Sequence, residues 1–445
     1  MTLHNLLHIL LLALLAVRPA AAQSHTPEPW RDPATPRSSA WLSLLPEGEA
    51  KRKFVLDCTG CHQFDARIAR PGGTPRTEAQ WVEAVTRMLG YAGATTSFPV
   101  IAADRDAAAT AAWLARHLAA GEVREPAFAS PGQAEVTEFL MPEPQDLPHD
   151  VAVEADGSVL VTGMFTHRLY RVSPATGAIG EIPIPVEKAN PRAIELDGQG
   201  RPWLVLGSPA KLATVADSQW RTFDVGMYAH SLAVGTDGKI WFNGHFTRAP
   251  EQIGSVDPAS GTVRTHDVPP HPTLAAGPGG PIPYELRTGP DGRVWMSELQ
   301  GNRLVAFTPG TGKFQTFTLP TPHSGPRRFD VDAKGIVWIP AYSANRLVRL
   351  DPATGGFREI DLPARDAVPY IVRSDPRDGS IWIGTAAADA LLRYRPATGR
   401  FDVYPLPTRG ALVRHLAIDA KAGAVWLAYG ASPGIPARIA RVVVK

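Results

Sequence analysis

Residues 283–322 read PYELRTGPDGRVWMSELQGNRLVAFTPGTGKFQTFTLPTP. This stretch holds four short runs of apolar or alternating residues, at 283–288, 294–296, 302–305 and 314–319, with turn sequences such as Asp-Gly and Pro-Gly between them. Short runs rich in β-branched and aromatic residues, bounded by Gly, Pro, Asn and Asp, are typical of strands joined by tight turns. The stretch therefore predicts one four-stranded antiparallel sheet.

The same pattern occurs seven times along the chain. The units open with PHDVAV, PRAIEL, AHSLAV, PYELRT, PRRFDV, PYIVRS and VRHLAI, at residues 148, 191, 229, 283, 326, 369 and 413. The one long interval contains an insertion around residues 271–281. Repeats of roughly 40–45 residues with four strands each are the signature of β-propeller blades. We expect an all-β seven-bladed propeller over residues 134–445, preceded by a small all-α domain.

The ends of the repeat predict how the ring closes. The last unit stops at Lys445 after its third strand, whereas residues 134–141, AEVTEFLM, resemble the closing strands of the other units. Exposed strand edges are a liability that propellers remove by pairing. We expect residues 134–141 to pair with the C-terminal strands.

The part before the repeat has a different composition. Residues 23–40 are rich in Pro, Ser and Thr and are expected to be a flexible lead-in, and residues 122–133 a short linker. Residues 41–121 show helical patterning, with Thr77 and Asp106 as candidate N-caps. Such a short helical domain has a small core and usually needs a disulfide or a cofactor to be stable.

Residues 1–22 resemble an export signal, with an apolar run that ends in Ala20-Ala21-Ala22. The interpretation is a periplasmic or secreted protein with no membrane span after cleavage; an uncleaved anchor is the alternative. The 45 Lys and Arg residues nearly balance the 43 Asp and Glu residues, which excludes a strongly basic nucleic-acid binder.

The strongest chemical signal is CTGCH at residues 58–62, which has the C-x-x-C-H spacing of covalent heme c attachment. Two thiols one helical turn apart can bond both vinyl groups of one heme, and His62 then faces the iron. Met88 is the candidate sixth ligand, with His117 as competitor and a purely structural Met88 as the third interpretation. A disulfide or thioredoxin-like pair is the alternative to heme, but the βαβ context of thioredoxin is absent here. A heme would imply an electron donor or acceptor in the periplasm.

The second residue of each repeat unit is expected at the mouth of the central channel. These seven side chains include no acid, and they are His149, Arg192, His230, Tyr284, Arg327, Tyr370 and Arg414. Arginine forks suit carboxylate or phosphate, and histidines act as acid or base near neutral pH. The interpretation is a site for a small polar or anionic molecule; the alternative is a water-filled channel whose arginines pair with Glu195 and Glu285.

Four further histidines are interpreted as polar surface. They fall in loops or on outer strands and lack the clustered spacing of a zinc or copper site. This group comprises His167, His245, His266 and His323.

Two family resemblances follow from these motifs. The 58–62 motif, followed by a helix from Trp81 to Arg87-Met88, resembles class I cytochromes c and the small cytochrome domains of quinohemoprotein amine dehydrogenases. The repeat phrases at 289–298 and 302–322 resemble the virginiamycin B lyases, also called streptogramin lyases.

The lyase resemblance implies a seven-bladed propeller that opens a cyclic ester with Mg²⁺ and two histidines. The matching positions here are Tyr370 and Arg414, and the two magnesium-binding glutamates would fall near Leu412 and Gly430. The resemblance therefore implies the fold, while the residues for Mg²⁺-dependent elimination are missing.

Three functional hypotheses remain open at this point. The first is a mono-heme oxidoreductase that couples electron transfer to a small molecule at the propeller mouth. The second is a C–O lyase in which His149 and His230 have taken over catalysis. The third is a binding module or redox sensor without turnover.

Overall fold

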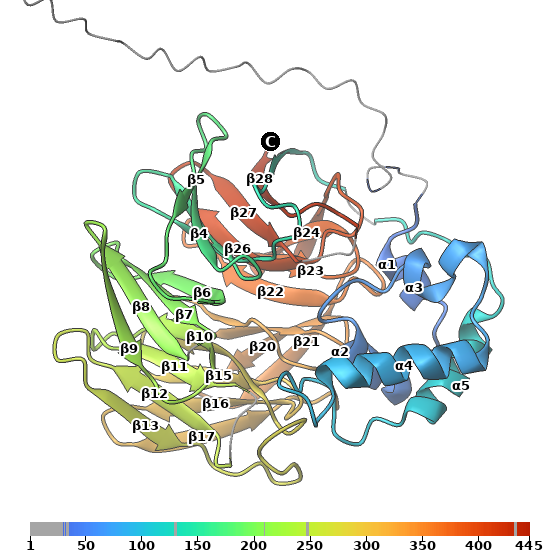
Figure 1. Cartoon of the computed structure of the whole chain (residues 1–445), viewed down its shortest axis with the longest axis horizontal. Coiled ribbons are helices and arrows are strands. Elements are labelled where there is room, and N and C mark those ends of the chain that lie inside the picture. Colours follow the sequence, from blue (N-terminus) through green and yellow to red (C-terminus); the bar gives the residue numbers. More distant parts are fainter. Residues whose placement is uncertain are drawn as a thin grey trace, which may run out of the picture.

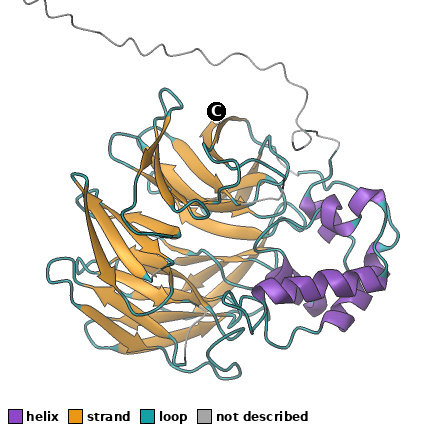
Figure 2. Cartoon of the chain, in the orientation of Figure 1, coloured by secondary structure: helices purple, strands orange, loops and turns teal. Residues whose placement is uncertain are grey.

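The computed structural model describes residues 30, 32, 35–128, 131–208, 210–245, 249–430 and 434–445. Sheets arranged around a ring form the larger part of the molecule, and helices lie together on one side of it (Figures 1 and 2). The predicted export signal lies outside the described residues. No helix in the described part is long and apolar enough to cross a membrane.

The helical part contains five described α-helices and one 3-10 turn. They are α1 (Ser38–Leu42), α2 (Glu49–Cys58), α3 (Ala66–Ala69), η2 (Pro71–Gly73), α4 (Glu78–Ala92) and α5 (Ala107–Leu118). Thr77 caps α4 in a capping box with Gln80, and Asp106 accepts hydrogen bonds from the first backbone amides of α5. These side chains satisfy amides that have no partner inside the helix.

The prediction that residues 23–40 form a flexible lead-in is wrong at its C-terminal end, where helix α1 begins. Ser38, Ser39 and Ala40 are helical and buried. The Ser38 hydroxyl donates to the carbonyl oxygen of Phe64, and the Ser39 amide donates to the carbonyl oxygen of Ala387 in the propeller. Tertiary contacts therefore order a segment whose composition alone favours a loop.

The repeat folds into seven four-stranded antiparallel sheets, as predicted. From the channel outward, the first four blades are β2 (Pro148–Val153), β3 (Val159–Gly163), β4 (Arg168–Val172), β5 (Ile179–Ile182); β6 (Pro191–Leu196), β7 (Pro202–Leu206), β8 (Lys211–Ala216), β9 (Gln219–Asp224); β10 (Ala229–Val234), β11 (Ile240–Gly244), β12 (Gln252–Val256), β13 (Val263–Asp267); and β14 (Pro283–Thr288), β15 (Val294–Glu298), β16 (Arg303–Thr308), β17 (Lys313–Thr318).

The last three blades include one strand from the start of the repeat. They are β18 (Asp330–Val331), β19 (Val337–Ala341), β20 (Arg346–Asp351), β21 (Gly356–Asp361); β22 (Pro369–Ser374), β23 (Ile381–Thr385), β24 (Ala390–Arg395), β25 (Arg400–Pro405); and β26 (Val413–Asp419), β27 (Ala424–Tyr429), β28 (Arg438–Val444), β1 (Ala134–Leu140).

The repeated Asp and Trp residues explain why the blades resemble one another. In the blade of β18–β21, the Trp338 indole donates to Asp332 at 2.9 Å, and Trp382 donates to Asp375 at 3.0 Å in the next blade. Both indole rings are buried between blades. One acidic residue at the turn thus satisfies the polar atom of a large core side chain, which a buried indole requires.

Strand β1 closes the ring by pairing antiparallel with β28 along its whole length. The register runs from Ala134 opposite Val444 to Leu140 opposite Arg438. The last blade therefore combines strands from both ends of the repeat, and β1 takes the outer-edge position so that β28 is paired on both sides.

The inner strand of the fifth blade is shorter than the repeat predicts. The unit PRRFDV opens at Pro326, yet β18 covers only Asp330–Val331. The amide of Arg328 instead donates to Tyr370 in the neighbouring blade, and the carbonyl of Arg328 accepts from Val372. Backbone pairing across the blade boundary replaces the start of this strand.

The helices pack against the propeller through a shared apolar core. Trp41, Leu56 and Phe64 belong to the same cluster of buried side chains as Tyr370 and Leu412. The insertion in the fourth unit also contacts the helical part, since the Gly279 amide donates to Pro99 at 3.3 Å. The predicted linker is tied down as well, because Gly132 donates to Val403 at 2.7 Å.

Candidate functional site

A cavity of about 480 Å³ lies where the inner strands begin, beneath the 58–62 segment. We call it the mouth cavity. Six of the seven side chains predicted at the channel mouth line it: His149, Arg192, His230, Tyr284, Arg327 and Arg414. The helical part contributes Gly60, Cys61, Tyr91 and Phe98 to the same walls. Its volume is in the range of small-molecule sites.

Tyr370, the seventh predicted residue, is fully buried. It is not on the cavity wall but contacts two side chains that are, Tyr284 and Arg414. Its hydroxyl oxygen lies 2.5 Å from the hydroxyl oxygen of Tyr284 and accepts a hydrogen bond from Arg414 at 2.9 Å. Although burial opposes ionisation, the adjacent Arg414 and Arg327 lower the pKa of the Tyr370 phenol.

The three mouth arginines have neutral partners. Arg192 donates to the side-chain oxygen of Asn190 at 3.1 Å and lies over the ring of Tyr228 at 4.7 Å. Arg327 donates to the Tyr284 hydroxyl at 2.9 Å. Among the described residues, none of the three forms an ion pair with a carboxylate, so the alternative in which they pair with Glu195 and Glu285 does not hold for these side chains.

Each of the two predicted catalytic histidines donates through Nδ1 to an oxygen atom. His149 Nδ1 lies 2.8 Å from the Asp150 carboxylate, and His230 Nδ1 lies 2.8 Å from the carbonyl oxygen of Tyr284. Arg328 also approaches His149 Nδ1, at 3.3 Å, but the shorter contact needs the proton on that nitrogen. Nε2 of each ring is then the hydrogen-bond acceptor.

Both histidines are neutral at pH 7. Burial lowers the pKa of His149 to about 3, despite the attraction of Asp150, and holds the pKa of His230 well below its usual value. The Asp150 carboxylate is already compensated by Arg328 at 2.8 Å, so a proton on His149 would add an unbalanced charge. The two ring centroids lie 5.6 Å apart, although the blade of Arg192 separates their strands in sequence.

His245 lies at the mouth of the channel, contrary to the prediction that it is polar surface. It is 1% exposed, lines the mouth cavity, and its Nδ1 lies 2.6 Å from the carbonyl oxygen of Pro283. Burial holds its pKa well below the usual value. The direction of the strands could have predicted this position. Strand β11 runs antiparallel to β10, so the C-terminal end of β11 returns to the mouth.

Deeper in the channel, charged side chains are paired. Arg328 binds Asp150 and lies 3.9 Å from Glu285, which also pairs with Arg373 at 3.1 Å and Arg287 at 3.2 Å. Burial raises the pKa of Glu285 in spite of these arginines. In this network each arginine has a carboxylate partner, so the charges deeper in the channel are balanced, although Nε of Arg287 and of Arg328 has no hydrogen-bond partner among the described residues.

A second cavity lies inside the helical part, and its walls are mainly apolar. Three of the predicted heme-binding side chains line it, namely Cys58, His62 and Met88, together with Phe54, Phe64, Trp81 and Leu114. Trp81 Nε1 is buried and has no hydrogen-bond partner. His117, the competing ligand, is not on these walls; its ring packs on Trp113 at 5.7 Å.

The two cysteines face different spaces. Cys58 lines the helical cavity, where burial raises the pKa of its thiol to about 12, whereas Cys61 is exposed and lines the mouth cavity. A thiol with a raised pKa is a poor nucleophile, unlike the reactive thiol of a redox pair. No group of three or more His, Cys, Asp or Glu suited to a metal ion occurs among the described residues.

The 58–62 segment touches the mouth side chains directly. Arg414 donates to the carbonyl oxygen of Gly60 at 3.0 Å, and the Thr59 and Tyr342 hydroxyls lie 2.8 Å apart. A Cβ atom at position 60 would overlap the guanidinium of Arg327. A larger residue at position 60 would therefore require the Arg327 guanidinium to move from its place among the mouth side chains.

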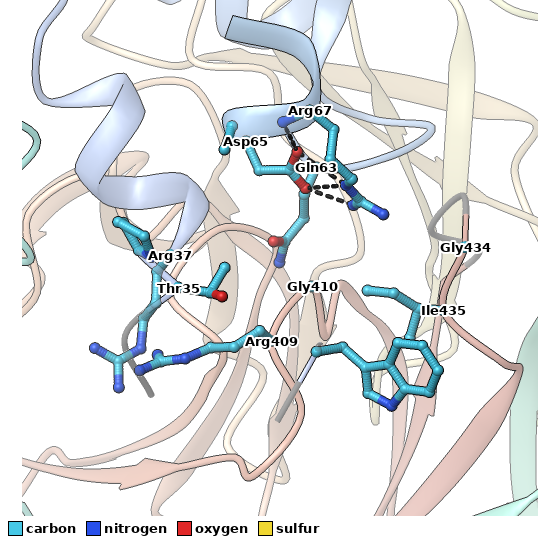
Figure 3. Close-up of a pocket in the computed structure, with 12 residues that line it drawn as sticks. Thr35, Arg37, Gln63, Asp65, Arg67, Arg409, Gly410, Gly434 and Ile435 are labelled. Carbon is cyan, nitrogen blue, oxygen red and sulfur yellow. Dashed lines mark hydrogen bonds and ion pairs between the residues drawn. The ribbon is translucent and has the colours of Figure 1, made fainter. Parts of the chain in front are cut away.

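Another cavity lies beside the mouth, between the start of the helical part and the last blades (Figure 3). Its labelled residues include Arg37, Gln63, Asp65 and Arg67, with Arg409 from the propeller side. Asp65 caps α3 and pairs with Arg67, while Arg409 binds Glu125 at 3.0 Å. These polar groups hold the two parts of the chain together.

Comparison with known proteins bears on the propeller. Residues 279–442 match the model of the virginiamycin B lyase family. No curated protein matches the chain at a significant level.

Several solved structures share the propeller fold. The virginiamycin B lyase of Staphylococcus aureus has a TM-score of 0.62 and 19% identity, covering 70% of this chain and 100% of that one. A streptogramin B lyase structure has a TM-score of 0.61 and 22% identity, covering 70% and 98%. YCF48 bound to D1 peptide has a TM-score of 0.56 and 11% identity, covering 72% and 99%.

The positions that match the family's functional residues are adjacent in space. Arg414 contacts the Tyr370 hydroxyl, and the Gly430 amide donates to the carbonyl oxygen of Leu412 at 2.6 Å. Side chains at Leu412 and Gly430 have no group that binds Mg²⁺. Glu298, the last residue of β15, is buried and bound by Arg303 at 2.5 Å. The propeller of this chain is virginiamycin B lyase-like in its repeat and its fold, with different residues at the matching site.

Proposed function

We propose that this chain is an exported mono-heme c-type cytochrome whose propeller binds a small polar or anionic molecule beside the heme. Heme c would be attached to Cys58 and Cys61, with His62 and Met88 at the iron. The observation that carries the proposal is the contact of the 58–62 segment with the mouth of the channel, where Arg414 donates to the Gly60 carbonyl.

The helical cavity, of about 180 Å³, matches such a group in the chemistry of its walls but not in its size, and Cys61 faces the mouth cavity instead, so heme attachment requires the 58–62 segment to rearrange. Its walls are aromatic and aliphatic, its two candidate iron ligands are His62 and Met88, and Trp81 Nε1 is a buried donor that needs an acceptor. His62 Nδ1 lies 3.1 Å from the carbonyl oxygen of Gln63, which favours Nε2 as the metal-binding nitrogen. When bound, heme would supply one-electron chemistry.

The mouth cavity supports a small substrate in preference to a large one. The helical part covers the channel entrance, so a ligand must fit within about 480 Å³ between Cys61 and the mouth histidines and arginines. This chain would orient the ligand through arginine N–H groups and accept a proton or hydrogen bond at His149 and His230. Electrons would pass to or from a periplasmic donor or acceptor.

The heme proposal is tested by spectroscopy of the protein produced in a host that attaches heme c. We expect a c-type pyridine hemochrome spectrum, heme that resists acid-acetone extraction, and reduction by ascorbate. The Cys58→Ala, Cys61→Ala double variant should lose covalent heme. Wild-type protein without heme under these conditions would contradict the proposal.

The sixth ligand is tested with three matched variants. Met88→Leu should remove the near-infrared charge-transfer band of methionine-ligated ferric heme and lower the reduction potential, because thioether ligation raises it. Met141→Leu, in the propeller core, is the control and should leave both unchanged. If the wild-type protein lacked this band, and His117→Gln changed the ferric heme spectrum while Met88→Leu did not, His117 would be the ligand.

A lyase is the second candidate, favoured by the two neutral histidines with rings 5.6 Å apart. One solved relative is a catalytically inactive virginiamycin B lyase with quinupristin. Incubation of this protein with quinupristin should give linear product, lost in His149→Gln or His230→Phe, if the chain is a lyase. We expect no product, since the mouth is covered and the matching residues differ.

A further inference from the structure

The mouth cavity contains three cationic side chains that form no ion pair with any carboxylate in the part of the chain that the structure describes. Arg192, Arg327 and Arg414 are each less than a tenth exposed, and their partners are an amide oxygen, tyrosine hydroxyls and a backbone carbonyl. Nε of Arg327 and of Arg414 is buried with no hydrogen-bond partner among the described residues, as is Nε of Arg328, but Arg328 has a carboxylate partner and the mouth arginines do not. Buried charge without compensation is costly, so such a cluster indicates an anionic ligand.

The charges are also close enough to repel one another. Burial lowers the pKa of Arg192, and the positive charge of Arg414 adds to this effect. A carboxylate between guanidinium groups would relieve the repulsion and accept paired N–H donors, which is the geometry that arginine recognises best.

Across the same cavity, His149 and His230 offer acceptors. Their Nδ1 protons are held by the Asp150 carboxylate and the Tyr284 carbonyl, so Nε2 of each ring carries a lone pair. A ligand that placed only apolar atoms there would leave these nitrogens unsatisfied. A hydroxyl group would donate to one of them.

We propose that the mouth cavity binds a small hydroxycarboxylate, with its carboxylate at the arginines and its hydroxyl donating to a histidine Nε2. The inference rests on the proposed small-molecule role of the mouth and names the substrate class. It needs no property of the heme, and the binding test below is independent of heme content.

The test is isothermal titration of the full-length protein with two matched pairs of acids, in a buffer free of phosphate and other carboxylates. Glycolate is compared with acetate, and lactate with propionate; within each pair only the hydroxyl differs. Methyl lactate, which keeps the hydroxyl and lacks the charge, completes the series. We expect each hydroxy acid to bind at least tenfold more tightly than its partner, and methyl lactate to show no binding.

Two variants separate the two halves of the site. Arg192→Met should weaken glycolate and acetate alike by tenfold or more. Arg221→Met is its control, because Arg221 also stacks on an aromatic ring, Phe223, but lies exposed on an outer strand. His230→Phe should reduce the preference for glycolate over acetate while leaving acetate affinity unchanged.

Equal binding of acetate and glycolate, an unchanged affinity in Arg192→Met, or no binding of any acid would overturn the inference. If no acid bound while the protein carried heme c, only the inference would fail. If glycolate bound to a protein without heme, the heme proposal would fail and the hydroxycarboxylate site would stand.

Discussion

Arg327 and Arg328 are neighbours in sequence and occupy opposite electrostatic settings. Arg327 lies at the mouth, over the ring of Tyr342 at 4.1 Å, and its hydrogen-bond partner is the Tyr284 hydroxyl. Arg328 lies within the channel and binds both oxygens of Asp150, at 2.8 and 2.9 Å. Both side chains are almost fully buried. The interior of the channel is therefore balanced in charge, whereas its mouth is not.

This contrast indicates which arginines contribute to the stability of the fold. A buried guanidinium that binds both oxygens of a carboxylate balances the charge of that carboxylate. Removing the guanidinium leaves the carboxylate buried without a counter-charge. A buried guanidinium with only neutral partners is held in place by the rest of the structure and is available to a ligand. Variants that remove one charge from each region measure this contrast.

The largest effect is expected for Arg328→Met. The change leaves Asp150 buried without its main counter-charge, so we expect a loss of about 3–5 kcal/mol in the free energy of unfolding. Urea denaturation followed by circular dichroism gives the value. Arg168→Met is the control, because Arg168 pairs with Glu181 at 2.6 Å on the surface, and it should cost less than about 1 kcal/mol. A similar cost for both variants would contradict the assigned role of the channel network.

Contact between the mouth and the 58–62 segment is tested by Gly60→Ala. The new methyl group would overlap Arg327, which is held among three tyrosines and has little room to move. Overpacking of this kind costs about 1–3 kcal/mol.

Gly90→Ala is the matched control for Gly60→Ala. Gly90 lies in α4 with open space around the added methyl group, and the same change there should stabilise the helix by about 0.5–1 kcal/mol. Thermal melts compare the two variants. Opposite signs are expected, and equal behaviour would show that position 60 does not restrict the approach of the two parts.

The pH dependence of stability reports on the neutral histidines at the mouth. An unfolded histidine has a pKa near 6.5, and His149 in the folded protein has a pKa of about 3. Between these values the unfolded chain binds more protons, so the free energy of unfolding falls as the pH drops from about 6.5 toward 3.

His149→Gln removes this contribution and retains a group that can bind Asp150. Its unfolding free energy should fall less steeply between pH 6 and 4, by about 1.4 kcal/mol per pH unit. Urea denaturation at three pH values in this window gives the slope. An unchanged slope would mean that His149 is protonated in the folded protein, contrary to its burial against Arg328.

The sequence predicted the blades because each unit carries its own local signals. Turn glycines with positive φ, such as Gly292 at 77° and Gly335 at 77°, and buried tryptophans recur at the same place in each repeat. The pairing of β1 with β28 could also be predicted, since the missing strand was visible at the other end of the repeat. Helix α1 could not, because its order comes from contacts with Phe64 and Ala387, which are distant in sequence.

The candidate site was predicted in part for the same reason. Register alone placed six of the seven predicted side chains around one cavity. His245 was missed because it follows the end of β11 and carries no repeat signal of its own. The covering of the mouth by the 58–62 segment was beyond sequence reasoning, since it depends on how two unlike parts of the chain pack.

The smallest stability effect is expected for Arg192→Met, and it is the counterpart of Arg328→Met. Arg192 is as buried as the channel arginines, but its removal strands no carboxylate, and methionine keeps much of the packing against Tyr228 and Phe98. The lost hydrogen bond to Asn190 is offset by relief of a buried, uncompensated charge. We therefore expect a change of less than about 1 kcal/mol in the free energy of unfolding, measured by urea denaturation as for Arg328→Met. A loss as large as that of Arg328→Met would show that the mouth arginines are structural, and the contrast between the two regions would then have no functional meaning.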